Sequence, residues 1–342
     1  MIFRNKRAAI ARGMIGSGLL GLLERWARRP SLVVVCYHRI GNPALDPFYR
    51  PVFSATPEHF RAQVQYLRDR FRLLRLDEVI PLVESGLDLK EPTALITFDD
   101  GYQDNFEVAL PILNELKAAA TFFLPADFLR SPRLFWWDRV AYVIHQTPLK
   151  SVTLDLPQPL HFDFSTSDRD AVIFEIVHAF LQEDLAGEKT FLAHLEERAE
   201  VDVLEKSLGG NLFMGFEAAR ILLKSGMDIG SHSLTHPKLA RLPEDVQYRE
   251  LVDSKSLLEQ ELGCPIEAIA YPFGGLDAFT NQTKRLARSA GYRLGFAFLG
   301  GTNRTGHVDA MALKRINVGF ADSPELLRAR LTLCASAGSS FV

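Results

Sequence analysis

Short apolar runs alternate with longer amphipathic segments along most of the chain. The apolar runs are predicted as strands, at residues 32–37, 93–98, 120–124, 227–231, 267–271, 294–298 and 312–318. The amphipathic segments are predicted as helices, at 57–70, about 244–262, about 280–290 and 324–334. Strands that alternate with helices in this way favour an α/β fold with a largely parallel sheet.

One long stretch interrupts this alternation. Residues from about 131 to 226 contain proline-punctuated segments and helical periodicity, mainly at 171–181 and 191–203. The stretch holds too many apolar residues for a linker. We therefore predict a helical insertion, at about 131–226, within one domain of residues 31–335.

The first 29 residues are basic. An apolar run at 13–23 lies between arginine and lysine residues, and it is too short to span a bilayer. No small-residue cleavage site follows it. We predict a basic amphipathic helix over 1–30 that packs on the domain, with peripheral contact to an anionic membrane surface or a signal sequence as alternatives. The expected location is cytoplasmic or membrane-peripheral, with export left open.

Composition narrows the function classes. The 342 residues are 47% hydrophobic and 24% charged, as in ordinary globular proteins. A net charge of −3 offers no electrostatic case for nucleic acid as a partner. The three cysteines are far apart and form no C-x-x-C motif, so we expect buried apolar residues instead of a disulfide framework.

Residues with metal-binding chemistry follow the predicted strands. Asp99 and Asp100 come after the run 93–98, and two adjacent carboxylates repel each other unless a cation is near. His232 and His236 come after the run 227–231. Two histidines and one aspartate leave a position open for water, as catalytic zinc requires. Each pair taken alone also fits a helix N-cap or a polar loop, but strand ends converge on one face of a parallel barrel.

A helix is expected to follow the aspartate pair. We predict that it begins near Asp104, with Glu107 three residues on as a capping-box partner.

The motifs T-F-D-D-G and H-S-x-x-H resemble the first two motifs of the polysaccharide deacetylase family (NodB homology, carbohydrate esterase family 4). The resemblance covers about 31–130 and 226–320. It implies a distorted (β/α)7 barrel and a metal-dependent N-deacetylase. In that family the matching residues would act as metal ligands (Asp100, His232 and His236), as the general base (Asp99) and as a backbone oxyanion donor (Phe273). Zinc is the default ion, and this ligand set also accepts cobalt, nickel or iron.

Two family motifs differ in this chain. Ala270-Tyr271-Pro272-Phe273 replaces R-x-P-Y, so the arginine that orients the base is missing, and the late L-x-L-x-H motif is absent. His38 follows the first strand and resembles the acid of a circularly permuted subgroup that includes enzymes for poly-N-acetylglucosamine. We predict His38 as the general acid, with a buried or capping histidine as the alternative. Arg315 or Arg39 is predicted to supply the guanidinium near Asp99, and we favour Arg315. Either arginine could instead be a structural ion-pair partner.

Substrate contacts are predicted from the same strand ends. Tyr271, Pro272, Phe273, Tyr102 and Asp104 are expected to line the groove. The run Phe135-Trp136-Trp137-Asp138 is either a sugar-stacking surface or core. His307 stays unassigned.

These observations predict a metal-dependent hydrolase that removes N-acetyl groups from an amino-sugar polysaccharide or its precursor. Its partner is then an N-acetylated oligo- or polysaccharide. A non-catalytic carbohydrate-binding or scaffold homologue, a hydrolase of another non-peptide C–N bond, and a membrane-surface partner protein remain as alternatives.

Overall fold

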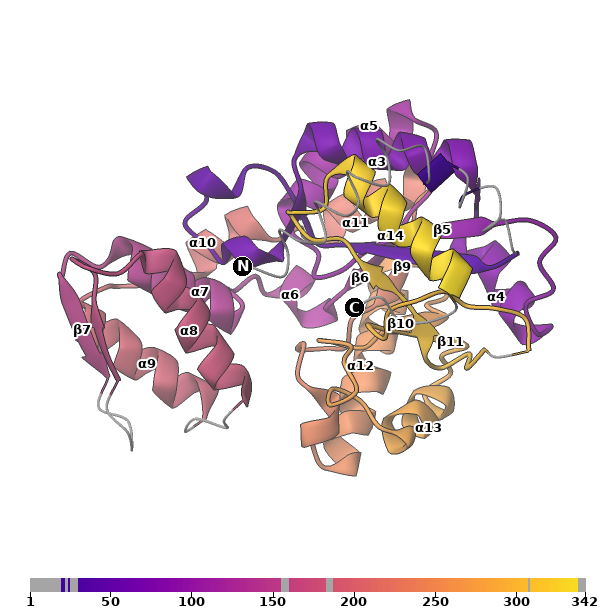
Figure 1. Cartoon of the computed structure of the whole chain (residues 1–342). Helices are drawn as coiled ribbons and strands as arrows, with labels where there is room; N and C mark the ends of the chain where they lie inside the picture. The colour runs from indigo at the N-terminus through magenta and orange to yellow at the C-terminus, as the bar shows by residue number, and fades with distance from the viewer. Residues whose placement is uncertain are drawn as a thin grey trace. The chain divides into compact units, whose positions relative to one another are not determined.

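The computed structural model describes residues 20, 21, 24, 30–154, 160–182, 187–306 and 308–337 (Figure 1). The described residues form two compact units. The larger comprises those of Met1–Gly41, Phe53–Ser131 and Phe213–Val342, and the smaller those of Asn42–Val52 and Pro132–Leu212. Among the described residues, no helix combines the length and apolar character that crossing a bilayer requires.

Most of the predicted N-terminal helix over 1–30 lies outside the described residues, as does His307. Its described members are Leu20, Gly21, Glu24 and Pro30. Leu20 is buried against Ala329, and the carboxylate of Glu24 accepts two hydrogen bonds from Arg328. The part of this segment that the structure describes therefore contacts the larger unit.

Parallel strands form the wall of a barrel in the larger unit (Figure 1). They lie in the order β12–β11–β10–β9–β6–β5–β1–β13, and every pairing in this series is parallel. Their bounds are β1 (Leu32–Tyr37), β5 (Thr93–Phe98), β6 (Thr121–Leu124), β9 (Asp228–Ser231), β10 (Ala268–Ala270), β11 (Leu294–Ala297), β12 (Leu313–Lys314) and β13 (Ile316–Asn317).

The wall closes at Arg315. This residue alone separates β12 from β13, which pair with β11 and β1 respectively, so one short segment joins the two ends of the sheet. Counting that segment as one strand reduces the eight strands of the series to seven. The predicted fold class, α/β with a distorted (β/α)7 barrel, is confirmed.

Alternate side chains of the strands face opposite sides of the wall. Leu32, Val34 and Leu95 join residues of β6, β10, β11 and β12 in one hydrophobic cluster. Because this cluster draws on strands all round the wall, it lies inside the barrel, together with residues of α4 (Leu76–Glu84). Cys36 and Asp99 continue the same face beyond Val34 and Leu95, which points their side chains inward at the carboxyl ends of the strands.

The other face of the wall packs against helices. Figure 1 shows α14 beside α3, and the two are in contact. The helices of this unit are α3 (Pro57–Arg70), α4, α5 (Leu110–Glu115), α6 (Ala126–Arg130), α11 (Phe216–Lys224), α12 (Glu244–Leu262), α13 (Asn281–Ser289) and α14 (Pro324–Ala337), with a π-helix η3 (Asn105–Ala109) and a 3-10 helix η4 (Leu239–Arg241). Short strands β2 (Arg39–Ile40) and β3 (Phe53–Ala55) pair with each other, and β4 (Arg72–Leu73) pairs with β5.

The predicted capping box of Asp104 and Glu107 is wrong. The segment begins as the π-helix η3, and Asp104 makes no capping hydrogen bond. Its carboxylate accepts hydrogen bonds from the backbone N–H of Ile40 at 3.0 Å and from Nε of Arg39 at 2.8 Å. Asp104 therefore fixes the chain after β1.

The smaller unit combines helices with one β-hairpin. It contains η1 (Pro43–Leu45), η2 (Arg50–Val52), α7 (Trp136–Gln146), the antiparallel pair β7 (Ser151–Leu154) and β8 (Leu160–Asp163), α8 (Arg169–Gln182), α9 (Glu188–Ala199) and α10 (Glu205–Leu212). Helix α11, which falls within the predicted insertion at 131–226, belongs to the larger unit.

The aromatic run of the smaller unit is core. Phe135, Trp136 and Trp137 are 3%, 8% and 6% exposed, and the rings of Phe135 and Trp137 stack at 4.5 Å. Asp138 is fully buried and accepts a hydrogen bond from the backbone N–H of Tyr49. These side chains present no flat exposed surface, so the sugar-stacking interpretation is wrong and the packing interpretation holds.

Candidate metal centre and active site

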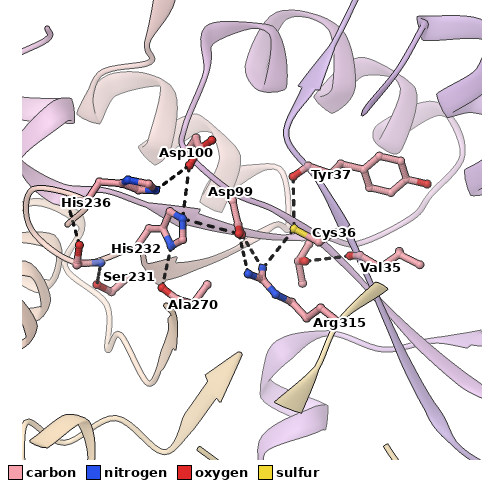
Figure 2. A network of polar contacts seen from close by, with 12 residues as sticks. Val35, Cys36, Tyr37, Asp99, Asp100, Ser231, His232, His236, Ala270 and Arg315 are labelled. Atoms are coloured by element: carbon pink, nitrogen blue, oxygen red, sulfur yellow. Dashed lines mark hydrogen bonds and ion pairs between the residues drawn. The ribbon is translucent and has the colours of Figure 1, made fainter. Parts of the chain in front are cut away.

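The carboxylate of Asp100 and the imidazoles of His232 and His236 meet at the carboxyl ends of β5 and β9 (Figure 2). Oδ1 of Asp100 lies 3.4 Å from Nε2 of His232 and 3.3 Å from Nε2 of His236. The three side chains are buried, and their ligand atoms lie within 4.8 Å of one another. Two imidazoles and one carboxylate with a further open position are the donor set of a catalytic zinc site, so these residues fit a divalent ion.

Hydrogen bonding orients the first imidazole for this task. Nδ1 of His232 donates to the carbonyl oxygen of Ala270 at 2.7 Å, which assigns the proton to Nδ1 and turns Nε2 toward Asp100. Although burial raises the pKa of Asp100, the imidazoles of His232 and His236 beside it outweigh this effect and hold that pKa far below its usual range. Burial lowers the pKa of His236, which favours the neutral imidazole that a metal ligand requires.

Asp99 and Arg315 form a buried, two-point ion pair. Nη1 and Nη2 of Arg315 each lie 2.7 Å from a carboxylate oxygen of Asp99, and neither side chain has exposed surface (Figure 2). Burial raises the pKa of Asp99, but the guanidinium of Arg315 outweighs it, so the pKa is lowered and the carboxylate is ionised. Oδ2 of Asp99 lies 3.8 Å from Nε2 of His232, beside the candidate metal ligands.

Arg39, the other arginine considered for this place, pairs with Asp104 instead. Its guanidinium also lies over the ring of Phe53, at 4.2 Å from the centroid. Of the two arginines, Arg315 is the one that contacts Asp99.

His38 lies close to the aspartate pair. A nitrogen of its ring is within 4.8 Å of a carboxylate oxygen of Asp99. The ring is partly exposed and stacks on Phe298 with 5.8 Å between centroids. Its backbone is held on both sides, because its N–H donates to Oγ of Ser54 at 2.9 Å and its carbonyl accepts from Nδ2 of Asn105 at 2.5 Å.

Left-handed backbone conformations mark the same region. Asp100, Ser233, His236 and Phe273 have φ of 74°, 63°, 63° and 62°. They are four of the seven non-glycine residues with positive φ in the described ranges. Such conformations cost free energy and cluster at functional sites, where the surrounding contacts enforce them.

The predicted substrate-lining residues divide into two groups. Phe273 is half-buried and lies against the candidate ligands, with its ring centroid 5.1 Å from that of His236. Pro272 is buried, and the side chains of Tyr271 and Tyr102 have no exposed surface. Tyr271 stacks on Phe279, and Tyr102 packs against Phe213. The expectation that these three side chains line the groove is corrected, because tertiary packing places them in the core.

Sequence reasoning missed one polar contact of the centre. Glu250 on α12 accepts hydrogen bonds from Leu234 and Thr235, within the loop that carries His236. A single glutamate on an amphipathic helix gives no sequence signal that would distinguish it from a surface residue.

Comparisons with known proteins agree with this geometry. The sequence profile described as polysaccharide deacetylase matches residues 86–145 and 204–295. A curated relative, YxkH of Bacillus subtilis, is 21% identical over 296 residues, which cover 85% of this chain and 74% of the relative. Its name gives a polysaccharide deacetylase activity and marks that activity as unproven.

Two solved structures share the fold. The deacetylase PplD of Streptococcus pyogenes, solved in complex with acetate, has a TM-score of 0.57 at 20% identity, over 89% of this chain and 99% of PplD. IcaB of Ammonifex degensii has a TM-score of 0.58 at 18% identity, over 91% of this chain and 99% of IcaB. The barrel, the two motifs and the profile match lead to one conclusion: residues 86–145 and 204–295 belong to a polysaccharide deacetylase domain.

Proposed function

We propose that the protein is a metal-dependent hydrolase that removes N-acetyl groups from an amino-sugar polysaccharide or its precursor. The observation that carries this proposal is the convergence of Asp100, His232 and His236 beside the ionised Asp99, at the carboxyl ends of the barrel strands. The PplD structure contains acetate, and a further structural neighbour from Aggregatibacter actinomycetemcomitans is described as a de-N-acetylase. Both support the choice of an acetamide substrate.

Asp100, His232 and His236 would hold the ion. A divalent ion there, zinc by default or else cobalt, nickel or iron, would polarise the acetamide carbonyl and lower the pKa of a bound water. Asp99 lies beside these residues, with its Oδ2 at 3.8 Å from Nε2 of His232.

Asp99 is the general base in this proposal. Its carboxylate is ionised because Arg315 lowers its pKa, so it can accept a proton from the attacking water. The two hydrogen bonds from Arg315 fix the plane of the carboxylate, which restricts the direction from which the proton is taken.

His38 and Phe273 complete the assignment. His38 would protonate the leaving amine, since its ring lies near Asp99 and remains partly exposed. The backbone N–H of Phe273 would stabilise the oxyanion of the tetrahedral intermediate, as the family resemblance implies.

The buried Asp99–Arg315 pair argues against a non-catalytic scaffold. Removing both charges from water carries a large desolvation cost, and a hydrophobic pair would serve stability as well or better. A carbohydrate-binding scaffold would have no use for a buried, ionised carboxylate beside a metal site. Hydrolysis of another non-peptide C–N bond uses the same groups and is distinguished by the substrate panel.

The test is acetate release from a panel of N-acetylated oligosaccharides by metal-stripped protein, with and without added zinc or cobalt. We expect release only after metal is restored. Release of a different acid or amine, with no acetate from any N-acetylated sugar, would contradict the proposed substrate class.

A further inference from the structure

Glu250 on α12 accepts hydrogen bonds from the loop that follows β9 and carries His236. Its Oε2 accepts hydrogen bonds from the backbone N–H groups of Leu234 at 3.0 Å and Thr235 at 2.8 Å. Its Oε1 accepts from the hydroxyl of Thr235 at 2.6 Å. The residue is only 8% exposed, so both oxygens of a nearly buried carboxylate are used on one short segment.

Leu234 and Thr235, which donate these hydrogen bonds, lie between two residues with strained backbone conformations. Ser233 precedes them and His236 follows them, and both have φ of 63°. A left-handed conformation of this kind persists only where surrounding contacts enforce it. The contacts made to the loop backbone between these two residues are therefore the ones that hold both conformations in place.

Helix α6 holds the opposite side of the same segment. The backbone N–H of Ala126 donates to the carbonyl of Ser233 at 3.1 Å, and that of Asp127 donates to the carbonyl of Leu234 at 3.0 Å. Helix α6 thus satisfies the carbonyls of Ser233 and Leu234, and Glu250 accepts from the N–H groups of Leu234 and Thr235. Of these partners, only the carboxylate of Glu250 can be removed by a side-chain substitution.

Ser254, one turn further along α12, supports the start of the loop. Its hydroxyl lies 2.9 Å from that of Ser231, which accepts a hydrogen bond from the N–H of Ser233 at 3.2 Å. Helix α12 therefore contacts the loop at two points, and Glu250 is the one nearer to His236.

We propose that Glu250 is a positioning residue of the metal centre, which holds His236 at its place beside Asp100 and thereby raises the affinity for a divalent ion. This inference rests on the proposed function, because it takes Asp100, His232 and His236 as the ligands. Without the carboxylate, two N–H groups and one hydroxyl lose their acceptor, which weakens the contacts that enforce the strained conformation of His236.

The test compares metal binding in metal-stripped wild type, Glu250→Ala and Glu250→Gln, by competition of zinc with a chelator. We expect Glu250→Ala to bind zinc about tenfold to a hundredfold more weakly, the range typical of outer contacts to metal ligands. Glu250→Gln should recover part of the loss, because its amide oxygen accepts from both N–H groups and its amide nitrogen donates to Thr235.

Glu259 provides the matched control on the same helix. Its carboxylate accepts hydrogen bonds from the backbone N–H of Ile266 at 2.9 Å and from Lys255 at 2.8 Å, so it also secures a loop. That loop carries no candidate ligand. Glu259→Ala should lower the melting temperature of the metal-free protein and leave zinc affinity within twofold of wild type.

The outcomes separate the two proposals. If wild type binds no zinc, the metal centre itself is refuted, and the role of Glu250 with it. If wild type binds one ion and Glu250→Ala binds it equally well, the positioning role alone is refuted. If Glu250→Ala does not fold, zinc affinity is measured in Glu250→Gln and Thr235→Val instead, because each substitution weakens the hydrogen bonds between Glu250 and the loop. Unchanged zinc affinity in both variants would refute the inference.

Discussion

Arg315 and Asp99 hold each other at the point where the barrel wall closes. Arg315 is the single residue between β12 and β13, and its guanidinium donates two hydrogen bonds of 2.7 Å to Asp99 after β5. The segment that closes the sheet thus carries the guanidinium that lowers the pKa of Asp99 and keeps the proposed base ionised. The last strand supplies the arginine that is missing from the third family motif.

Substituting Arg315 should affect catalysis even where charge is kept. In Arg315→Lys, an ammonium cannot donate to both oxygens in a fixed plane, so we expect kcat to fall about tenfold to a hundredfold with little change in KM. Arg315→Met leaves the buried carboxylate without its partner, and we expect a loss of about 3–5 kcal/mol in unfolding free energy. Steady-state kinetics and chemical denaturation measure the two effects. A lysine variant with wild-type kcat would contradict the orienting role.

Replacing Asp99 should separate metal binding from turnover. Asp99→Asn keeps the shape but removes the base, so we expect kcat to fall by about 10²–10⁴ while one ion per chain stays bound. Elemental analysis and acetate release check the two parts. His236→Ala is the complementary control, since it should lose the ion. Full activity in Asp99→Asn would remove the base assignment.

The role of His38 can be tested with two leaving groups. His38→Gln should fold and bind metal, and its kcat on N-acetylated sugars should fall by about 10²–10⁴ because the amine leaves unprotonated. 4-Nitrophenyl acetate has a leaving group that departs without a proton, so the variant should hydrolyse it at close to the wild-type rate. Equal losses on both substrates would point to a structural histidine instead.

The contact made by Glu24 predicts a pH dependence of stability. Although burial raises the pKa of Glu24, the hydrogen bonds from Arg328 outweigh it, so the pKa in the folded state is lowered from 4.5. The stabilising contribution is therefore present above about pH 4.5 and is lost as the pH falls through the lowered value. The difference in melting temperature between wild type and Glu24→Gln should be largest near pH 7 and shrink toward pH 3. A difference that is independent of pH would show that the charge of Glu24 contributes nothing.

The barrel and its ligand pairs could be predicted because they depend on local pattern. Most wall strands are short apolar runs, and parallel strands bring the residues after them together. That rule brings the aspartate pair to the same place as His232 and His236, and the family resemblance selects Asp100 as the ligand. The preference for Arg315 over Arg39 also matches the observed contacts, because Arg315 pairs with Asp99 whereas Arg39 pairs with Asp104.

The remaining features depend on tertiary packing. Tyr271 lies in a motif and Tyr102 directly follows one, yet both side chains are buried in the core. Asp104 has the sequence of a helix cap, but Arg39 and Ile40 compete successfully for its carboxylate. Glu250 belongs to no motif, and only the folded loop reveals its partners.

The most direct test of the account is a zinc titration of metal-stripped protein, with acetate release measured at each ratio of zinc to chain. The proposed centre predicts that activity rises in proportion to bound zinc and reaches its plateau at one ion per chain. Acetate release that is already complete without metal, or that ignores zinc bound at one ion per chain, would contradict it.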